Sequence, residues 1–360
     1  MAERSRGRTR AGQSNGSDAG DTKIDLIRAD TLEPTPIRWI WPGWIATGKL
    51  HLLAGRAGTG KTTIATKIAA TISLGGTWPD GTTAEQGDVA IWSGEDGVED
   101  TLLPRLLAAG ADTSRLRFVG DVTTGQVKRP FIPATDIPAL ATELDRIPNL
   151  RLVILDPVIV AVSGDSNKSG DVRRGLQPLA DLAERHKVAV LGITHFNKGI
   201  AGNHQLDRVT GSLAWGAAAR IVLGTAQGDG DRRLVRLKSN LGIDEGGFSY
   251  NLTQASVSET SSMTAQTVQW GEMLEGSGNE LLAELEPDQA VGTTKLSLAC
   301  NWLETALVTG EKAATKIRTE ANSAGHTWRT IERATMKLGV HKKKSGEDGG
   351  WVWELPKTAN

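Results

Sequence analysis

The sequence is poor in cysteine, in tyrosine and in long apolar runs. Its single cysteine, Cys300, excludes an internal disulfide framework and fits a reducing, cytoplasmic environment. The most apolar run, residues 152–162, is too short to span a bilayer and contains Asp156. Because no apolar segment follows the arginine-rich N-terminus, we expect no signal peptide and no membrane partner.

The sequence also lacks a charge excess of either sign. With a formal net charge of −1, any nucleic-acid surface must be local rather than global. The 39% apolar and 23% charged content is that of an ordinary soluble globular protein. Residues 1–22 contain almost nothing apolar and cannot offset their ordering entropy by burial, so they are predicted to form a disordered tail.

Apolar runs of strand length alternate with helical periodicity over residues 23–274, which we predict to be one domain. Strands without alternating polar positions, separated by amphipathic helices, are typical of a parallel sheet covered on both faces. Later strands at 234–239 and 248–253 follow without helices and predict antiparallel members. The predicted fold is therefore α/β, with a mostly parallel sheet flanked by helices. The runs predicted as parallel strands are 49–55, 88–95, 115–120, 150–156, 187–196 and 220–226.

A second, smaller domain is predicted over residues 294–356. Residues 275–293 lack a convincing period and are interpreted as a linker, and residues 357–360 as a tail. Three helical patterns are followed by two short strands around a glycine-rich turn at 346–350. Three helices before a hairpin predict a winged-helix-like domain.

A glycine-rich segment after the first parallel strand matches the P-loop pattern Gly-x-x-x-x-Gly-Lys-Thr. Its glycines let the backbone bend and direct N–H groups at phosphate oxygens, and the following helix presents its positive dipole end to the same anion. Lys61 is expected to reach the β- and γ-phosphates of ATP, and the Thr62 hydroxyl to ligate Mg²⁺. The predicted nucleotide-binding residues are Gly55, Arg56, Ala57, Gly58, Thr59, Gly60, Lys61, Thr62 and Thr63.

Three further strands end in polar residues that suit phosphate chemistry. Asp156 ends an apolar strand and is the expected second magnesium ligand. Glu95 is the first acidic residue after its strand and is predicted to act as general base on the attacking water, the alternative being a solvated loop carboxylate. His195 ends another strand and is predicted to sense the γ-phosphate, although a lone histidine is often only a satisfied core residue.

These four elements in this order resemble the RecA-like ATPases, and most closely the RepA-like hexameric helicase ATPases of plasmids and phages. The resemblance covers roughly residues 36–272 and includes the lead-in at 41–50, Ser93-Gly-Glu95-Asp96 with Arg105, and Thr194-His195. It implies a homo-oligomeric, hexameric ring with ATP sites between subunits. It also implies loops that line a central channel and bind single-stranded DNA.

By this resemblance the DNA loops are residues 163–174 and 198–208. Both are glycine-containing and basic, which suits contact with a phosphate chain, whereas ordinary surface loops remain the alternative. The expected DNA-binding residues in them are Lys168, Arg173, Arg174, Lys198 and Arg208.

A subunit-interface ATPase needs a cation from the neighbouring subunit. In DnaB-type helicases, a Lys-x-Arg pair supplies it, but here the matching residues are Lys238 and Asn240. RepA-like members place the arginine after the DNA loop, which makes Arg220 the candidate. A structural role for Arg220 is the alternative.

The C-terminal domain has eleven Lys and Arg against seven Asp and Glu between residues 294 and 360. This local positive excess predicts binding of duplex DNA by the third helix and the wing. A replication-protein contact and a merely solubilising charge are the alternatives. The basic residues concerned are Arg329, Arg333, Lys337, Lys342, Lys343 and Lys344.

The sequence therefore predicts an ATP- and Mg²⁺-dependent DNA motor, a ring-forming replicative helicase. Two other functions stay open. One is a recombination or repair ATPase that forms filaments, and the other is an ATP-switched adaptor or regulator that binds DNA.

Overall fold

The computed structural model describes residues 24–196, 209, 213–228, 230–258, 262–285, 295–308, 310–345 and 350–356. The chain divides into two compact units, Met1–Pro36 and Ile37–Asn360. In the first unit, the described residues contain one short 3-10 helix, η1 (Ala29–Thr31). The predicted tail at 1–22 lies outside the described residues. The elements that follow all belong to the second unit.

A nine-stranded sheet organises this unit, in the order β13-β12-β11-β10-β3-β9-β8-β4-β5. The strands from β10 to β5 pair in parallel, whereas β11, β12 and β13 continue the sheet in antiparallel pairing. The predicted parallel sheet with antiparallel final members is thus confirmed. The strands are β3 (Leu50–Gly55), β4 (Asp88–Ser93), β5 (Leu116–Phe118), β8 (Leu150–Asp156), β9 (Ala189–His195), β10 (Ile221–Gly228), β11 (Asp231–Ser239), β12 (Glu245–Ser256) and β13 (Thr264–Ser277).

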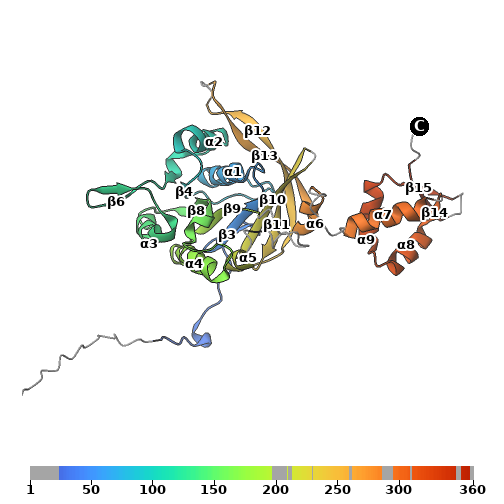
Figure 1. The fold of residues 1–360 in the computed structure, drawn as a ribbon, viewed down its shortest axis with the longest axis horizontal. Coiled ribbons are helices and arrows are strands. Elements are labelled where there is room, and N and C mark those ends of the chain that lie inside the picture. Colours follow the sequence, from blue (N-terminus) through green and yellow to red (C-terminus); the bar gives the residue numbers. More distant parts are fainter. Residues whose placement is uncertain are drawn as a thin grey trace, which may run out of the picture. The chain divides into compact units, whose positions relative to one another are not determined.

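Helices cover both faces of the sheet, so its parallel strands are buried on both sides (Figure 1). One apolar cluster joins α1 (Lys61–Leu74) and α2 (Leu103–Ala108) to one face. The other joins α3 (Pro133–Leu144), α4 (Ser169–His186), α5 (Leu213–Ala218) and α6 (Gly278–Ala283) to the opposite face. The remaining elements before α6 are β1 (Trp39–Trp41), β2 (Ile45–Ala46), η2 (Val98–Leu102), η3 (Thr113–Arg115), β6 (Val122–Thr124), β7 (Val127–Arg129) and η4 (Val158–Ala161).

The tryptophans have a structural role that composition alone did not reveal. Trp41 stacks on Trp44 and Trp78 with ring centroids 5.0 and 4.6 Å apart. Phe248 of β12 and Trp270 of β13 pack against the same ring at 5.8 and 5.9 Å. This aromatic cluster attaches the β1–β2 hairpin, which leads into the P-loop strand, to the antiparallel strands of the sheet.

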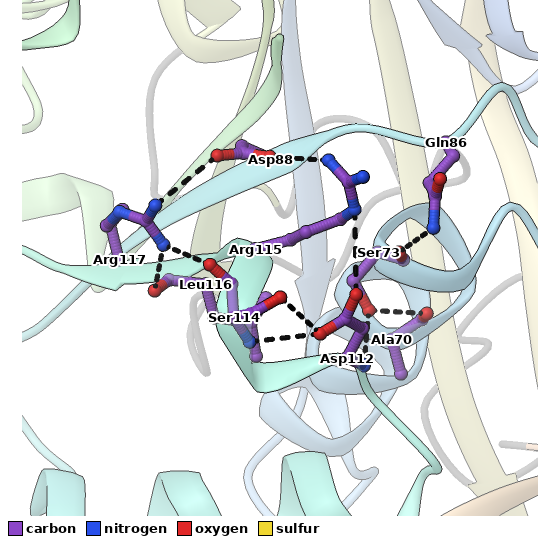
Figure 2. A network of polar contacts seen from close by, with 9 residues as sticks. All are labelled: Ala70, Ser73, Gln86, Asp88, Asp112, Ser114, Arg115, Leu116 and Arg117. Carbon is purple, nitrogen blue, oxygen red and sulfur yellow. Dashed lines mark hydrogen bonds and ion pairs between the residues drawn. The ribbon is translucent and has the colours of Figure 1, made fainter. Parts of the chain in front are cut away.

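A polar network ties the far end of α1 to the amino ends of β4 and β5. Figure 2 shows Asp88 facing Arg115 and Arg117, with an Arg115–Asp88 distance of 3.1 Å and an Arg117–Asp88 distance of 3.7 Å. The Ser73 hydroxyl of α1 accepts the N–H of Asp112 at 3.0 Å. The helix that begins at the P-loop is therefore held at its opposite end as well.

Residues 275–285 differ from the predicted linker. β13 extends to Ser277, whose hydroxyl caps α6 by accepting the N–H of Glu280. Leu281 and Leu282 of α6 are buried against the sheet. The prediction of a linker is therefore wrong for residues 275–285. Two adjacent leucines are enough to bury this short helix, and a helix so short gives no periodic pattern in the sequence. Residues 286–294 lie outside the described residues.

The C-terminal part has an apolar cluster of its own. The described residues of this part form three helices and a three-stranded sheet of order β14-β16-β15. The helix and hairpin order agrees with the predicted pattern, and the winged-helix interpretation stays a prediction. The elements are α7 (Lys295–Leu307), β14 (Lys312–Ala313), α8 (Ala314–Ser323), α9 (Trp328–Lys337), β15 (His341–Lys344) and β16 (Trp351–Glu354).

We expect the fold to lose stability in acid because of His51, a buried histidine in the P-loop strand β3. Its Nε2 accepts the Ala46 N–H at 2.9 Å, so Nδ1 carries the proton and donates to the Val190 carbonyl at 3.2 Å. Burial lowers its pKa to about 4. Because the pKa is lower in the folded state, the unfolded chain takes up the proton first, and stability is lost as pH falls from about 6.5 toward 4. We expect the free energy of unfolding to drop by about 2 kcal/mol between about pH 7.5 and pH 5.

Urea denaturation followed by tryptophan fluorescence measures this change. His51→Gln is the matched control, because its amide oxygen can accept the same N–H but does not titrate. An equal loss of stability in the variant and the parent would contradict the assignment to His51.

Candidate functional site

The P-loop connects the carboxyl end of β3 to the first turn of α1. Gly58 and Gly60 have φ angles of 81° and 86°, a left-handed conformation that side chains disfavour. A Cβ atom on Gly55 would lie 2.0 Å from the Thr225 hydroxyl, so only glycine fits at the end of the strand. The loop therefore leads directly into the α1 N-terminus at the carboxyl edge of the sheet, the arrangement that anion-binding loops use.

Two strands later in the chain, β10 and β12, hold the loop through Thr59, in contacts that sequence analysis missed. The Thr59 hydroxyl lies 2.7 Å from the Thr225 hydroxyl of β10. Tyr250 of β12 donates its hydroxyl proton to the Thr59 carbonyl. Burial raises the pKa of Tyr250, which keeps this donor protonated. The only sequence signal was that Tyr250 is the single tyrosine of the chain.

Lys61 lies in the centre of the site and is buried, with 6% of its surface exposed. Its ammonium donates to the carbonyls of Gly55 and Arg56 at 3.1 and 2.9 Å, and lies 3.2 Å from His195 Nδ1. Burial lowers its pKa, and the negative charges of Asp156 and Glu95 oppose that shift. The lysine is thus placed as a cation among the residues that the sequence predicted for phosphate chemistry.

Thr62 and Asp156 meet as predicted for a magnesium site. The Thr62 hydroxyl donates to the Asp156 carboxylate at 2.6 Å. Burial raises the pKa of Asp156, and the hydrogen bond from Thr62 opposes this shift. A hydroxyl and a carboxylate oxygen side by side match the oxygen ligands that Mg²⁺ prefers next to nucleotide phosphates. The residues present therefore fit the ion.

Glu95 follows β4 in a turn that a serine fixes. The Ser93 hydroxyl accepts the N–H groups of Glu95 and Asp96 at 3.3 and 2.9 Å. Asp96 forms an ion pair with Arg105 at 2.7 Å. Within the described part of the chain, the exposed Glu95 carboxylate has no hydrogen bond or ion pair, and its charge acts on Lys61, Asp156 and His195. Glu95 is therefore the carboxylate that remains available for chemistry.

His195 ends β9, the strand between β3 and β8, and its side chain is exposed. Desolvation lowers its pKa, and the positive charge of Lys61 lowers it further. Because the Lys61 ammonium can only donate, Nδ1 is the acceptor and the proton of the neutral ring is on Nε2. The ring thus offers an N–H donor at the carboxyl edge of the sheet.

The structure does not bring Arg220 together with these residues. Its backbone N–H donates to the carbonyl of Leu50 at 2.9 Å, so it lies at the beginning of β3 and the P-loop at the end. The rise of five residues along β3 separates the backbone of Arg220 from the P-loop by about 17 Å. Lys238 lies at the same edge as Arg220, and its ammonium binds the carbonyls of Gly216 and Ala219 at 2.6 and 3.0 Å. Arg220 cannot serve the P-loop of its own chain.

Arg220 lines an open groove of about 350 Å³ at this amino edge of the sheet. Lys49 and Arg173 contribute further positive charge, and Asp181 and Glu184 of α4 contribute negative charge. The groove therefore offers side chains of both charge signs to a subunit interface.

The predicted DNA-binding residues before residue 220 are only partly described. Lys168 and Arg173 are exposed at the beginning of α4, whereas Arg174 is paired with Asp171. Trp215 donates its indole N–H to the carbonyl of Ser166 at 3.1 Å and so fixes the loop before α4. The predicted residues Lys198 and Arg208 lie outside the described residues.

The predicted basic residues of the C-terminal part are partly engaged. Arg333 pairs with Glu284. Lys343 pairs with Glu311 and Glu354 at 2.9 and 3.1 Å, and Lys342 lies 4.6 Å from the centroid of the Trp353 ring. Arg329, Lys337 and Lys344 are exposed.

No helix in the described ranges combines the length and apolarity that a membrane span requires.

The chain was compared with known sequences, solved structures and protein families. A search of curated protein sequences gave no match. Among solved structures, one described as an ATPase domain is similar, with a TM-score of 0.42 and 14% identity over 56% of this chain and 80% of that chain. The sequence profile of the AAA domain matches residues 18–201, just over half of the 360 residues. The chain therefore belongs to the AAA domain family.

Proposed function

We propose that the protein is an ATP-hydrolysing, DNA-dependent motor ATPase, a ring-forming replicative DNA helicase of the RepA-like type. The observation that carries the proposal is the convergence of Lys61, Thr62, Asp156, Glu95 and His195 at one edge of the sheet. A lysine for phosphate, two oxygen ligands for Mg²⁺, an exposed carboxylate and an imidazole donor are the groups that hydrolysis of a nucleoside triphosphate requires.

Each residue has a distinct chemical task. Lys61 and the backbone N–H groups of the P-loop bind the phosphates, while Thr62 and Asp156 would hold Mg²⁺, which neutralises phosphate charge. Glu95 accepts a proton from the attacking water. His195 donates its Nε2 proton to an oxygen of the γ-phosphate. Asp96 and Arg105 hold the turn that positions Glu95.

The position of Arg220 supports assembly of several copies. A cation on the edge opposite the P-loop can reach a phosphate only in a neighbouring subunit. A contact between opposite edges of identical subunits is heterologous, and such contacts produce rings when the rotation closes. We propose that Arg220 stabilises the transition state of the neighbouring site and that the ring is hexameric.

Single-stranded DNA is the proposed track. Lys168, Arg173, Arg174, Lys198 and Arg208 would contact its phosphates. The C-terminal basic residues Arg329, Arg333, Lys337, Lys342, Lys343 and Lys344 would bind duplex DNA or a replication protein.

Steady-state ATP hydrolysis with and without single-stranded DNA tests this function. We expect strong stimulation by single strands, because the proposed DNA loops follow the strands that end in Asp156 and His195. Binding of the strand should weaken with salt at a log–log slope of about −0.7 per neutralised phosphate. A strand-displacement assay then tests unwinding itself.

Lys61→Ala is expected to abolish the stimulated rate. Lys67→Ala, further along α1, is the matched control and should hydrolyse ATP at the same DNA-stimulated rate as the parent. Hydrolysis that is indifferent to single strands, with tight binding to one duplex sequence, would replace the motor by an ATP-switched adaptor. DNA-stimulated hydrolysis on filaments without strand displacement would point to a recombination ATPase.

A further inference from the structure

The ammonium group of Lys61 has no N–H left for a phosphate in the observed arrangement. It carries three N–H bonds, and three acceptors surround it: the carbonyls of Gly55 and Arg56 and Nδ1 of His195. A β-phosphate can therefore bind Lys61 only if one of these acceptors gives up its hydrogen bond.

Of the three acceptors, His195 is the one that lies outside the P-loop and is open to water. The Gly55 and Arg56 carbonyls each accept a second hydrogen bond, from the Phe196 N–H at 3.3 Å and the Thr59 hydroxyl at 2.9 Å, which fixes them in the loop. Both carbonyls also belong to the P-loop itself and stay close to Lys61. The imidazole comes from a different strand and is exposed, so water can replace Lys61 at Nδ1.

We propose that His195 competes with the nucleotide for Lys61 and so weakens binding of the diphosphate product. The inference rests on the proposed function, because it takes residues 55–62 as the nucleotide site. In this role His195 positions the lysine, in addition to its proposed contact with the γ-phosphate. The exchange responds to any nucleotide with a β-phosphate, whereas a γ-phosphate sensor responds to ATP alone.

The residue after His195 links the end of β9 to the P-loop. The N–H of Phe196 donates to the Gly55 carbonyl at 3.3 Å, and Phe196 forms a β-bridge with Val209. The exchange at His195 therefore takes place beside the residue that joins the P-loop to this bridge.

ADP affinity separates this role from that of a γ-phosphate sensor. Loss of the competing acceptor in His195→Ala should tighten ADP binding about 3- to 10-fold, the effect of one net hydrogen bond. A residue that only senses the γ-phosphate would leave ADP affinity unchanged. A structural residue would weaken it. Titration with a fluorescent ADP in the presence of Mg²⁺ measures the change, and stopped-flow release shows whether ADP leaves more slowly.

Two further variants make the test specific. His195→Gln retains a side-chain acceptor and should bind ADP like the parent. His341→Ala, on the exposed face of β15, should also leave ADP affinity unchanged. Unchanged or weaker ADP binding in His195→Ala would overturn the proposal.

A double-mutant cycle with Lys61 completes the experiment. On a Lys61→Ala background, the His195→Ala substitution should no longer tighten ADP binding, because no lysine remains to compete for. Equal tightening on both backgrounds would refute the competition. If Lys61→Ala alone leaves ADP affinity unchanged, the assignment of the nucleotide site itself fails, which is a distinguishable result.

Discussion

Substitution of Glu95 by glutamine is expected to slow ATP hydrolysis by about 10²- to 10⁴-fold, the usual contribution of a positioned general base. The amide has nearly the same shape but cannot accept the proton of the attacking water. Nucleotide binding should persist, because Lys61, Thr62 and the P-loop backbone remain in place. Single-turnover hydrolysis, together with titration of fluorescent ATP, measures the two effects separately.

Glu99→Gln is the matched control for this substitution. Glu99 is an exposed carboxylate four residues further along, in η2, and its loss should leave the rate within about twofold, as for an ordinary surface position. A small effect of Glu95→Gln, or an equal effect of both variants, would show that another group activates the water.

Asp96 is the obvious competitor for the role of base, and its contacts argue against it. Its carboxylate accepts a hydrogen bond from Arg105 in an ion pair at 2.7 Å, so one of its oxygens already has a partner. Asp96 therefore fixes the turn, whereas the neighbouring Glu95 is free to act. The sequence alone could not separate the two, because both are acidic and adjacent.

The site elements that the sequence predicted are those with a local signal. The P-loop is recognisable because glycine spacing, lysine and threonine all fall within eight residues between a strand and a helix. Asp156 and His195 were found because each ends a strand of nearly uninterrupted apolar residues. In a parallel sheet such strand ends must meet at one edge, so local patterns were sufficient to predict a shared site.

The elements that the sequence did not reveal depend on long-range packing. Tyr250 and Thr225 support the P-loop from strands that lie more than 160 residues away in the chain. β13 was missed because it alternates polar and partly buried residues around two glycines at the edge of the sheet. The aromatic cluster around Trp41 joins four separate segments and has no periodic pattern. Contacts of this kind become visible only when the strands are placed in space.

Substitution of Arg220 by alanine is expected to lower ATP hydrolysis by about a thousandfold while leaving nucleotide binding intact, if it acts as a cation in trans. The sharper prediction concerns mixtures. Arg220→Ala subunits retain an intact P-loop, and Lys61→Ala subunits retain an intact arginine. Each variant alone should be inactive, but an equal mixture should recover activity at about a quarter of its heterologous interfaces, where a complete site forms.

Complementation of this kind is expected only when Arg220 and the P-loop lie on opposite edges of the sheet and act across a subunit interface. A residue that acts on its own P-loop, or that merely stabilises the fold, cannot be rescued by a partner that lacks Lys61. Arg185→Ala is the matched control, because Arg185 is an exposed arginine in the last turn of α4, and the variant should hydrolyse ATP like the parent. Mixed assemblies are verified by co-purification of differently tagged subunits. If such assemblies form and remain inactive, Arg220 has a structural role, and the transition-state cation must come from elsewhere.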